Sequence, residues 1–534
     1  MRKLLLLFFL TILPLMAIAD PVKIGGIYYN LDAAARTAQV TCGEISYEGD
    51  FVIPETVNSG GVDYIVTAIA DDAFYKYVYT GSGYRTVMSH ITSVTIPKSV
   101  ISIRDAFRLS YELTSIVVAK DNKVYDSRNN CNAIIETATN RLIVGCVNSI
   151  IPSDVVIIGE HAFYRRGLTN LNLPEGLKEI EKYAFQGNAK LKSVAFPSTL
   201  TTLRDDCFSN CDLISIEIPA SLSNLGTSVF EGNMNLERIV VAKGNQRYSS
   251  PNGCNAIVDT QLNAIVQGCS TTVIPEGITR LWLSSFNSTG IKKLLIPEGI
   301  TDLGDYTFYD CDRLEEISIP STTNFIGKVT FYDCVSLKKI YCYLNEPYAL
   351  STEYNGPFGC NGSEKDKVYQ QATLYVPKGT KAKYKAAEIW SKFSQIEEME
   401  DTNPEDKEGE GKVIVPDVDV LKIWMANGEV VSLALDEEPK TSYADGKLVI
   451  KTTAKTFTYP LENVRKFTYY MAKNFLLGDA DGNGGVNNDD VIAVSNKILG
   501  KHSGRFVVEN ADMNGDNKVN AVDIVMIISM LKAQ

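Results

Sequence analysis

The chain has 534 residues, a length typical of several domains rather than one. Hydrophobic residues make up 45% of it and charged residues 22%, an ordinary composition for a folded globular protein. The net charge of −12 argues against binding to nucleic acid, which needs a basic face, and the lysines and arginines form no concentrated patch.

The first 19 residues have the pattern of a secretory signal peptide. Arg2 and Lys3 precede an apolar run that ends in the small-x-small sequence AIA, so we expect Asp20 to begin the mature chain. The alternative is a membrane anchor, but the apolar run is shorter than the roughly 20 residues that span a bilayer. We therefore expect a secreted, extracellular protein.

Residues 20–90 alternate apolar and polar side chains, as in VKIGGIYYNL from Val22 onward. We interpret them as an N-terminal cap and a first repeat, since the open end of a stacked core needs a closing element. A tyrosine-rich insert at 75–90 occurs only once in the chain.

Residues 91–396 contain a repeated unit, of which LTNLNLPEGLKEIEKYAFQGN at 168–188 is one copy. A proline recurs every 22 or 23 residues, with one longer step of 56 residues, and a phenylalanine follows each proline by eleven residues. Such a fixed period predicts a solenoid of stacked units. The prolines are Pro152, Pro174, Pro197, Pro219, Pro275, Pro297 and Pro320, and the phenylalanines are Phe163, Phe185, Phe208, Phe230, Phe286, Phe308 and Phe331.

Each unit predicts a short strand, a turn and a return leg. In 168–173 the leucines point inward and the asparagines outward, because alternate residues of a strand face opposite sides. Pro174 ends this strand, since proline lacks a ladder donor, and Phe185 fills the core from the return leg. Three residues after five of these phenylalanines, a small polar or thiol group is placed to satisfy buried backbone groups of the turn. This ladder position is occupied by Asn188, Cys211, Asn233, Cys311 and Cys334.

The outward positions of the predicted strands form one long face. Solenoids use such faces for binding, and the alternative for each residue is a merely solvated sheet. The face is mostly small and polar and lacks the aromatic row expected of a sugar platform. Its residues are Ser93, Thr95, Asn170, Asn172, Ser193, Ala195, Ser215, Glu217, Lys293, Leu295, Glu316 and Ser318.

Two related insertions, 117–146 and 240–269, align without a gap at an offset of 123 residues. Each contains a predicted hairpin, so a block of several repeats was duplicated as a whole.

The chain has eleven cysteines, which in a secreted protein suggests some disulfides and at least one thiol. The hairpins predict Cys131 opposite Cys146 and Cys254 opposite Cys269, either as disulfides or as paired buried thiols. We expect the ladder cysteines to be buried and inert, and no CxxC sequence indicates a zinc site.

Few residues suggest catalysis. The chain has three histidines, His90, His161 and His502, and we interpret His161 as a solvated loop residue. A nucleophilic triad therefore has few candidates, and the acidic residues fall at repeat turns with no unrepeated segment to form a pocket. We expect a protein that is not an enzyme.

The repeat region ends in a last strand, followed by Pro377 and a predicted helix. Tyr384, Trp390 and Phe393 are expected to lay this helix over the final coil. Residues 397–411 are rich in acidic side chains and predict an extended linker.

Residues 412–470 alternate apolar and polar side chains and contain Asn-Gly and Asp-Gly turn signals. They predict a small antiparallel β-domain whose role is that of a spacer.

The repeat pattern LxxLxLPEGLxxIxxxAFxxC/N resembles the BspA-like leucine-rich repeats of bacterial surface and secreted proteins, over roughly residues 20–400. The resemblance implies a right-handed β-rich solenoid and a role in binding. It implies no chemistry.

Residues 474–534 contain two loops with the side-chain spacing of an EF-hand calcium loop. Oxygen ligands stand at positions 1, 3, 5, 9 and 12, with a backbone carbonyl due at position 7. A single such run could be an acidic surface turn, but two copies in register predict two Ca²⁺ ions. The ligands are Asp479, Asp481, Asn483, Gly485, Asn487 and Asp490 in the first loop, and Asp512, Asn514, Asp516, Lys518, Asn520 and Asp523 in the second.

Position 12 is aspartate in both loops, and each loop is followed by an apolar helical pattern with no helix before it. These features resemble a type I dockerin, a small helical domain that binds calcium and docks into a cohesin on a scaffold or cell-surface protein. The resemblance places partner choice at loop positions 10 and 11, which are Asn488, Asp489, Ala521 and Val522. The two pairs differ in polarity, which predicts one binding orientation.

Together these patterns predict a secreted, non-catalytic binding or adhesion protein, held at the cell surface through a cohesin. Its repeat surface would bind an unknown protein or glycan ligand. The alternative is an accessory or enzymatic component of a cellulosome-like polysaccharide-degrading complex, because dockerins usually occur in the components of such complexes.

Overall fold

The computed structural model describes residues 20–399, apart from Ile45, Ser82 and Glu276, together with six strands between residues 420 and 470 and the single position Val494. The chain divides into two units, Met1–Asp401 and Thr402–Gln534, each described by itself. The predicted signal peptide, most of the linker and the predicted dockerin lie outside the described residues. Among the described residues, no helix has the length and apolar content to cross a membrane.

The first unit begins with antiparallel strands and then changes to parallel pairing. β1 (Val22–Ile24), β2 (Ile27–Asp32) and β3 (Thr37–Thr41) pair in sequence, and β5 (Thr56–Ser59) pairs antiparallel with β6 (Val62–Ile69). β3 and β6 then pair in parallel, so the stack begins at this sheet. Tyr29, Val40 and Val66 are fully buried there.

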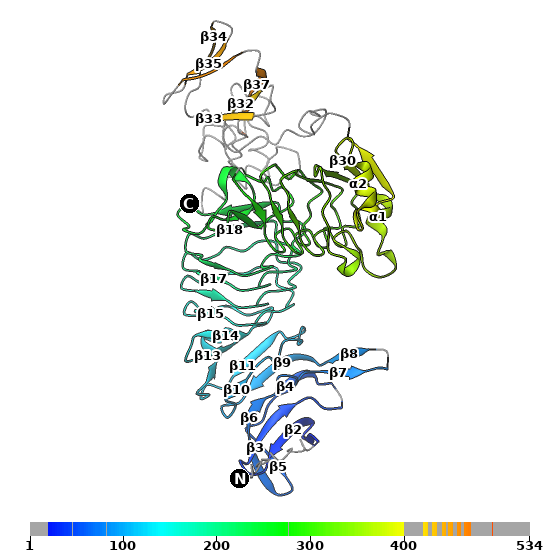
Figure 1. Cartoon of the computed structure of the whole chain (residues 1–534). Helices are drawn as coiled ribbons and strands as arrows, with labels where there is room; N and C mark the ends of the chain where they lie inside the picture. Colours follow the sequence, from blue (N-terminus) through cyan, green and yellow to red (C-terminus); the bar gives the residue numbers. More distant parts are fainter. Residues whose placement is uncertain are drawn as a thin grey trace, which may run out of the picture. The chain divides into compact units, whose positions relative to one another are not determined.

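Two ladders of short parallel strands build the rest of the first unit (Figure 1). The first ladder contains β4 (Glu48–Val52), β9 (His90–Ile96) and β11 (Ser115–Val118), then β18 (Ser215–Ile218) and β20 (Arg238–Val241), then β25 (Lys293–Leu294), β27 (Glu316–Ile319), β29 (Lys339–Cys342), β30 (Thr373–Val376) and β31 (Gln395–Glu398). The second contains β10 (Ser102–Ile103) beside β6, then β14 (Arg141–Val144), β15 (Ile157–Ile158), β16 (Glu179–Ile180), β17 (Thr202–Leu203) and β19 (Asn224–Leu225), then β23 (Ala264–Gln267), β24 (Arg280–Leu281), β26 (Asp302–Leu303) and β28 (Phe325–Ile326).

The phenylalanines of successive units stack in the core, as the period predicts. Phe163, Phe185 and Phe208 lie with ring centroids 5.1 and 5.0 Å apart, and Phe308 and Phe331 lie 5.2 Å apart with nearly parallel rings. All five are buried. Between the insertions, a stack of this kind ties each unit to its neighbours, because successive rings pack against one another.

Both predicted hairpins form within the insertions. The first contains β12 (Tyr125–Asp126), η1 (Arg128–Asn130), β13 (Ile134–Glu136) and β14. The second contains β21 (Tyr248–Ser249), η2 (Pro251–Gly253), β22 (Ile257–Asp259) and β23. Each hairpin feeds its last strand into the second parallel ladder, through β14 to β15 and through β23 to β24.

Neither predicted disulfide forms among the described residues. A β-bulge between Ile134 and Ile135 shifts the hairpin register by one residue, and such a shift turns the following side chains to the other face. The Cys146 thiol therefore contacts Asn132 rather than Cys131.

The second hairpin carries the same bulge, between Ile257 and Val258, and its Cys269 thiol contacts the carbonyl oxygen of Asn255. In each insertion the two cysteines also belong to different hydrophobic clusters.

The strand predicted at 168–173 is wrong, because this segment has no regular strand pairing. The neighbouring edge, β11, is already closed by the first insertion. The Ile116 amide donates to Asn132 Oδ1 at 2.6 Å, and Asn132 Nδ2 donates to the Thr114 carbonyl at 2.8 Å. The amide of Val118 likewise donates to a side chain of the insertion.

The C-terminal end of the first unit closes as predicted. It contains η3 (Glu353–Asn355), η4 (Gly362–Glu364), α1 (Lys367–Gln371), α2 (Lys381–Ala386) and η5 (Trp390–Lys392). Tyr384, Trp390 and Phe393 are buried, and Phe393 and Trp390 pack against Phe358, the last ring of the stack.

The described part of the second unit consists of two three-stranded antiparallel sheets. One has the order β33 (Val430–Ala434), β32 (Val420–Met425), β37 (Val464–Tyr470). The other has the order β34 (Lys440–Ala444), β35 (Lys447–Lys451), β36 (Thr456–Pro460).

Candidate binding surface

The outward side of the first ladder is the surface that the repeat pattern predicts for binding. Along β18, Ile216 and Ile218 are buried while Glu217 is exposed, so the strand alternates as expected. Most predicted positions lie outward. Asn170, Asn172, Ser193, Ala195, Glu217, Lys293 and Leu295 are exposed, and Ser93, Thr95, Ser215 and Glu316 are half-buried.

Ser318 is the exception, because it is buried and only 4% exposed. Its hydroxyl accepts a hydrogen bond from the Ile296 amide at 2.7 Å and donates to the Ile296 carbonyl. The reason is that β25 ends at Leu294, so the backbone of Ile296 takes the serine side chain in place of a ladder partner. Ser318 is therefore structural.

Polar contacts run across the outward face from strand to strand. Lys293 Nζ lies 2.7 Å from Glu316, and the Ser93 hydroxyl donates to Asp50 at 2.6 Å. Exposed ion pairs contribute little stability, on the order of 0–1 kcal/mol. Pairs such as Lys293 and Glu316 nevertheless bring opposite charges on the strand face together.

Two tyrosines on this face were missed by the sequence reasoning. Tyr341 and Tyr375 are register partners in β29 and β30, and their rings stack at 4.9 Å with planes 13° apart. Both are half-buried. Because each ring face covers the other, the pair adds no open aromatic platform to the strand face.

The predicted ladder position is confirmed as a satisfier of turn backbone. Asn188 is fully buried, its Nδ2 donates to the carbonyls of Phe163 and Phe185, and its Oδ1 accepts from the Leu168 amide. Asn233 makes the same three contacts in its own unit.

The ladder cysteines replace this amide with a thiol. Cys211, Cys311 and Cys334 donate to the carbonyls of phenylalanines one unit back, at 3.4, 3.0 and 3.1 Å. Burial raises the pKa of the Cys211 and Cys311 thiols to about 12. These thiols are therefore unreactive at neutral pH, as predicted.

Arg166 occupies the ladder position of the unit that follows the first insertion. Its guanidinium donates to the carbonyls of Gly145 and Phe107, at 2.9 and 2.8 Å, and to that of Ser110. Burial lowers the pKa of this guanidinium to about 10. The long side chain spans the gap that the insertion opens, and its place three residues after Phe163 was the signal in the sequence.

The prediction for His161 is wrong, because its side chain is only 7% exposed. Nδ1 lies 3.0 Å from Asp105 Oδ1, and the ring stacks on Tyr183 at 5.1 Å. The first insertion places the Phe107 turn beside the Phe163 turn, which brings in an aspartate 56 residues away in sequence. His161 is a packed structural residue, whereas His90 is exposed and pairs with Glu112.

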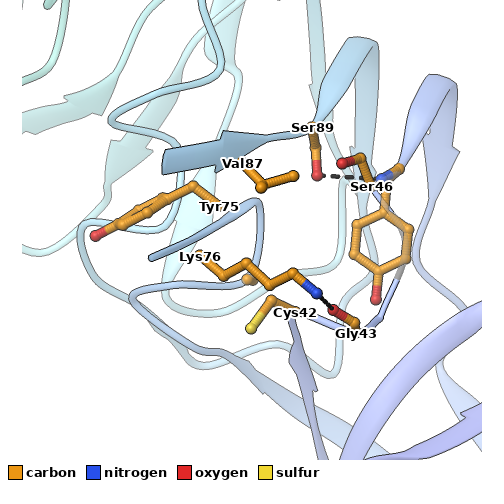
Figure 2. A pocket seen from close by; sticks show the side chains of 9 residues that line it. Cys42, Gly43, Ser46, Tyr75, Lys76, Val87 and Ser89 are labelled. Atoms are coloured by element: carbon orange, nitrogen blue, oxygen red, sulfur yellow. Dashed lines mark hydrogen bonds between the residues drawn. The ribbon is translucent and has the colours of Figure 1, made fainter. Parts of the chain in front are cut away.

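A shallow hollow lies at the base of two further strands, β7 (Tyr75–Tyr79) and β8 (Tyr84–Met88) (Figure 2). Cys42, Tyr75, Lys76 and Ser89 line it. Burial, and secondarily Asp72, raises the pKa of the Cys42 thiol, which makes it a poor nucleophile.

The predicted calcium ligands at 479–490 and 512–523, and the predicted partner-binding residues Asn488, Asp489, Ala521 and Val522, all lie outside the described residues. His502 lies there too. They stay predictions.

Comparison with family models identifies both interaction modules. A BspA type leucine-rich repeat region, in six copies, matches residues 156–265 and 266–347. The chain thus contains a leucine-rich repeat region. A dockerin type I domain matches residues 477–532, so the chain combines a BspA-type leucine-rich repeat region with a type I dockerin. Both modules are non-catalytic, and dockerins bind calcium and cohesins.

The solved structures that match the chain include bacterial leucine-rich repeat proteins. A leucine-rich cell surface protein from Faecalibacterium prausnitzii is 20% identical over 71% of this chain and 95% of its own, with a TM-score of 0.43. The pneumococcal vaccine antigen PcpA is 20% identical over 72% of this chain and 99% of its own, with a TM-score of 0.40. No curated protein matches the chain.

Proposed function

We propose that this chain is a secreted, non-catalytic binding protein that a calcium-loaded dockerin attaches to a cohesin. The observation that carries the proposal is the presence of a six-copy repeat region and a dockerin in one chain. The repeat region offers a long outward face, and the dockerin supplies attachment. The two sheets between 420 and 470 act as a spacer between them.

The attachment rests on the two predicted Ca²⁺ ions. Each loop offers five side-chain oxygen ligands and one carbonyl, which suits a hard cation that takes 6–8 oxygens. The second loop has Asn517 at position 6, where glycine is usual. Asparagine tolerates the left-handed conformation needed there better than most residues, but less readily than glycine. We therefore expect this loop to hold calcium less tightly than the first.

Calorimetric titration of the full chain with type I cohesins from secreted scaffold proteins of the source organism tests this proposal. We expect binding in calcium and none in EDTA. Asp479→Ala combined with Asp512→Ala removes the first ligand of each loop and abolishes binding in calcium. Binding that persists in EDTA would contradict the proposal.

The two docking faces are expected to be unequal, because Asn488 and Asp489 are polar whereas Ala521 and Val522 are apolar. One orientation on the cohesin should therefore dominate. Exchanging the two pairs should weaken cohesin binding. If the affinity of the exchanged variant is unchanged, the chain binds in either orientation.

The dockerin also favours a second reading, in which the chain is an accessory or enzymatic part of a polysaccharide-degrading complex. Release of reducing sugar from soluble plant polysaccharides by the purified full chain distinguishes the two. We expect no release, and a calcium-independent release would overturn the non-catalytic role.

A further inference from the structure

The strands β7 and β8 form an arm that the repeat pattern does not explain. They make a separate two-stranded antiparallel sheet, with Tyr77 opposite Thr86 and Tyr79 opposite Tyr84. The arm projects from the side of the stacked strands near the N-terminal end (Figure 1). A two-stranded sheet that projects in this way contributes little to a core, so its side chains call for another role.

Tyrosine supplies four of the six side chains on one face of this arm. Because residues directly opposite each other share a face, the register places six side chains together. They are Tyr75, Tyr77, Tyr79, Tyr84, Thr86 and Met88. Three of the rings are mostly open to solvent, with exposed fractions of 60% for Tyr77, 64% for Tyr79 and 77% for Tyr84.

The opposite face holds the arm to the body of the unit. Lys76 Nζ donates to the carbonyls of Gly43 and Glu44, at 2.7 and 3.1 Å. Figure 2 shows Lys76 pointing toward Gly43 and Tyr75 pointing the other way. The charged side chains of the arm, Lys76 and Arg85, both lie on this face by register. The tyrosine face is therefore uncharged and turned away from the anchoring contacts.

The arrangement of the rings indicates the shape of a ligand. Tyr79 and Tyr84 have centroids 5.4 Å apart with planes at 61°, and Tyr75 and Tyr77 lie 5.8 Å apart at 80°. Unlike the stacked pair on the strand face, these rings do not cover each other. Their inclined planes leave ring surface exposed to solvent along the arm, which suits a single twisted chain better than a flat surface.

The size and charge of the face select among ligands. Five residues of strand cover about 17 Å, so two strands give on the order of 200 Å². A stable protein interface needs about 800 Å² per partner, and the tyrosine face is too small for one. It offers uncharged aromatic rings for the C–H faces of sugar rings and phenol groups for their hydroxyls.

We propose that the tyrosine face binds a neutral polysaccharide chain. This role goes beyond the docking function above and does not depend on calcium. The ligand chain lies along the arm across Tyr77, Tyr79 and Tyr84. It gives the protein a carbohydrate contact separate from the outward face of the repeats.

Affinity electrophoresis of the full chain tests this role, in native gels containing xyloglucan, arabinoxylan, galactomannan or mixed-linkage β-glucan, with polygalacturonate as a charged comparison. We expect at least one neutral polysaccharide to retard the chain, equally with calcium or EDTA. The triple variant Tyr77→Ala, Tyr79→Ala, Tyr84→Ala should bind at least tenfold more weakly.

Two controls separate ring stacking from damage to the arm. The matching triple phenylalanine variant keeps the rings and should stay within about threefold of the parent, and Val78→Ala on the opposite face should leave binding unchanged. Circular dichroism checks that all variants fold. Retardation by polygalacturonate alone, by no polysaccharide, or equally for parent and triple alanine variant would overturn the proposal. Since cohesin docking needs calcium and this binding does not, either can fail without the other.

Discussion

Single buried polar side chains decide how the turns of this solenoid are closed. A buried backbone group without a partner costs about 1–3 kcal/mol, and one asparagine or cysteine in most units prevents that cost. Asn188 serves two carbonyls and one amide, whereas Cys211 donates to one carbonyl. Asparagine and cysteine therefore occupy the same position in their units, but asparagine satisfies more backbone groups.

Replacing Asn188 with alanine should lower the free energy of unfolding by about 2 kcal/mol, because it leaves the buried Leu168 amide without a partner and removes one of two donors from the Phe163 and Phe185 carbonyls. Asn188→Cys, which copies the neighbouring units, should lose only about 1 kcal/mol. Hydrogen–deuterium exchange of peptides covering 163–190 in the full chain measures the local effect. Asn170→Ala is the exposed control, and an equal effect of all three changes would contradict this role for Asn188.

Asp206 gives the stability a pH dependence. Burial, and then the neighbouring Glu231, raise the pKa of this carboxyl from 3.8 to about 6. The folded protein keeps the proton up to about pH 6, while the unfolded chain loses it near pH 3.8. The stability contributed by Asp206 is therefore complete below about pH 4 and is lost as pH rises through about 6.

Asp206→Asn should raise the free energy of unfolding at pH 7 by about 1 kcal/mol. A full shift of this size would give about 3 kcal/mol, but the side chain is half in contact with solvent, which reduces it. Thermal unfolding at pH 7 and pH 4 measures the difference. The gain should disappear at pH 4, and a gain of equal size at both values would show that the carboxyl does not titrate as described.

The period of the repeat predicts the ladder residues, since their role depends on contacts within one unit and its neighbour. It gives the position of Arg166, three residues after Phe163, but it does not predict the partners of Arg166 or His161. Their partners, Phe107 and Asp105, lie more than fifty residues earlier in the sequence. They become neighbours only because the first insertion folds aside, and alternation along a strand carries no information about that.

At the scale of elements, each insertion replaces part of the regular ladder. In the first insertion, Asn132 binds the edge of β11 with its side chain, so the strand predicted at 168–173 finds no partner. The hairpins themselves were predictable from turn signals. The bulge in each was not, because one extra residue changes no hydrophobic pattern and yet reverses which way the cysteines face.

Because of that bulge, Cys131 and Cys146 should both be thiols in the folded protein. Reducing agent should leave the melting temperature unchanged. Unfolding the chain in iodoacetamide without reductant should alkylate both residues, as read by peptide mass mapping. A linked peptide containing both cysteines would show that the register in solution lacks the bulge.

At the scale of the whole molecule, the described residues of the first unit form three hydrophobic clusters. One cluster ends and the next begins within each of the two insertions. The repeats between insertions share one stack of rings, so their stability is cooperative along that stack. The predicted calcium loops belong to the other unit of the chain. Loss of calcium should therefore act on one unit and spare the other.

Chelation by EDTA should unfold residues 474–534, since a loop closed by carboxylates repels itself without its ion and metal binding supplies the folding energy of such small domains. Exchange protection of peptides in this segment should disappear and return when calcium is added in excess. Peptides across the phenylalanine stack, for example those containing Phe185 or Phe308, should exchange as before. A loss of protection in the stack would show that the repeat unit depends on the dockerin, and a dockerin that stays protected in EDTA would refute the calcium sites.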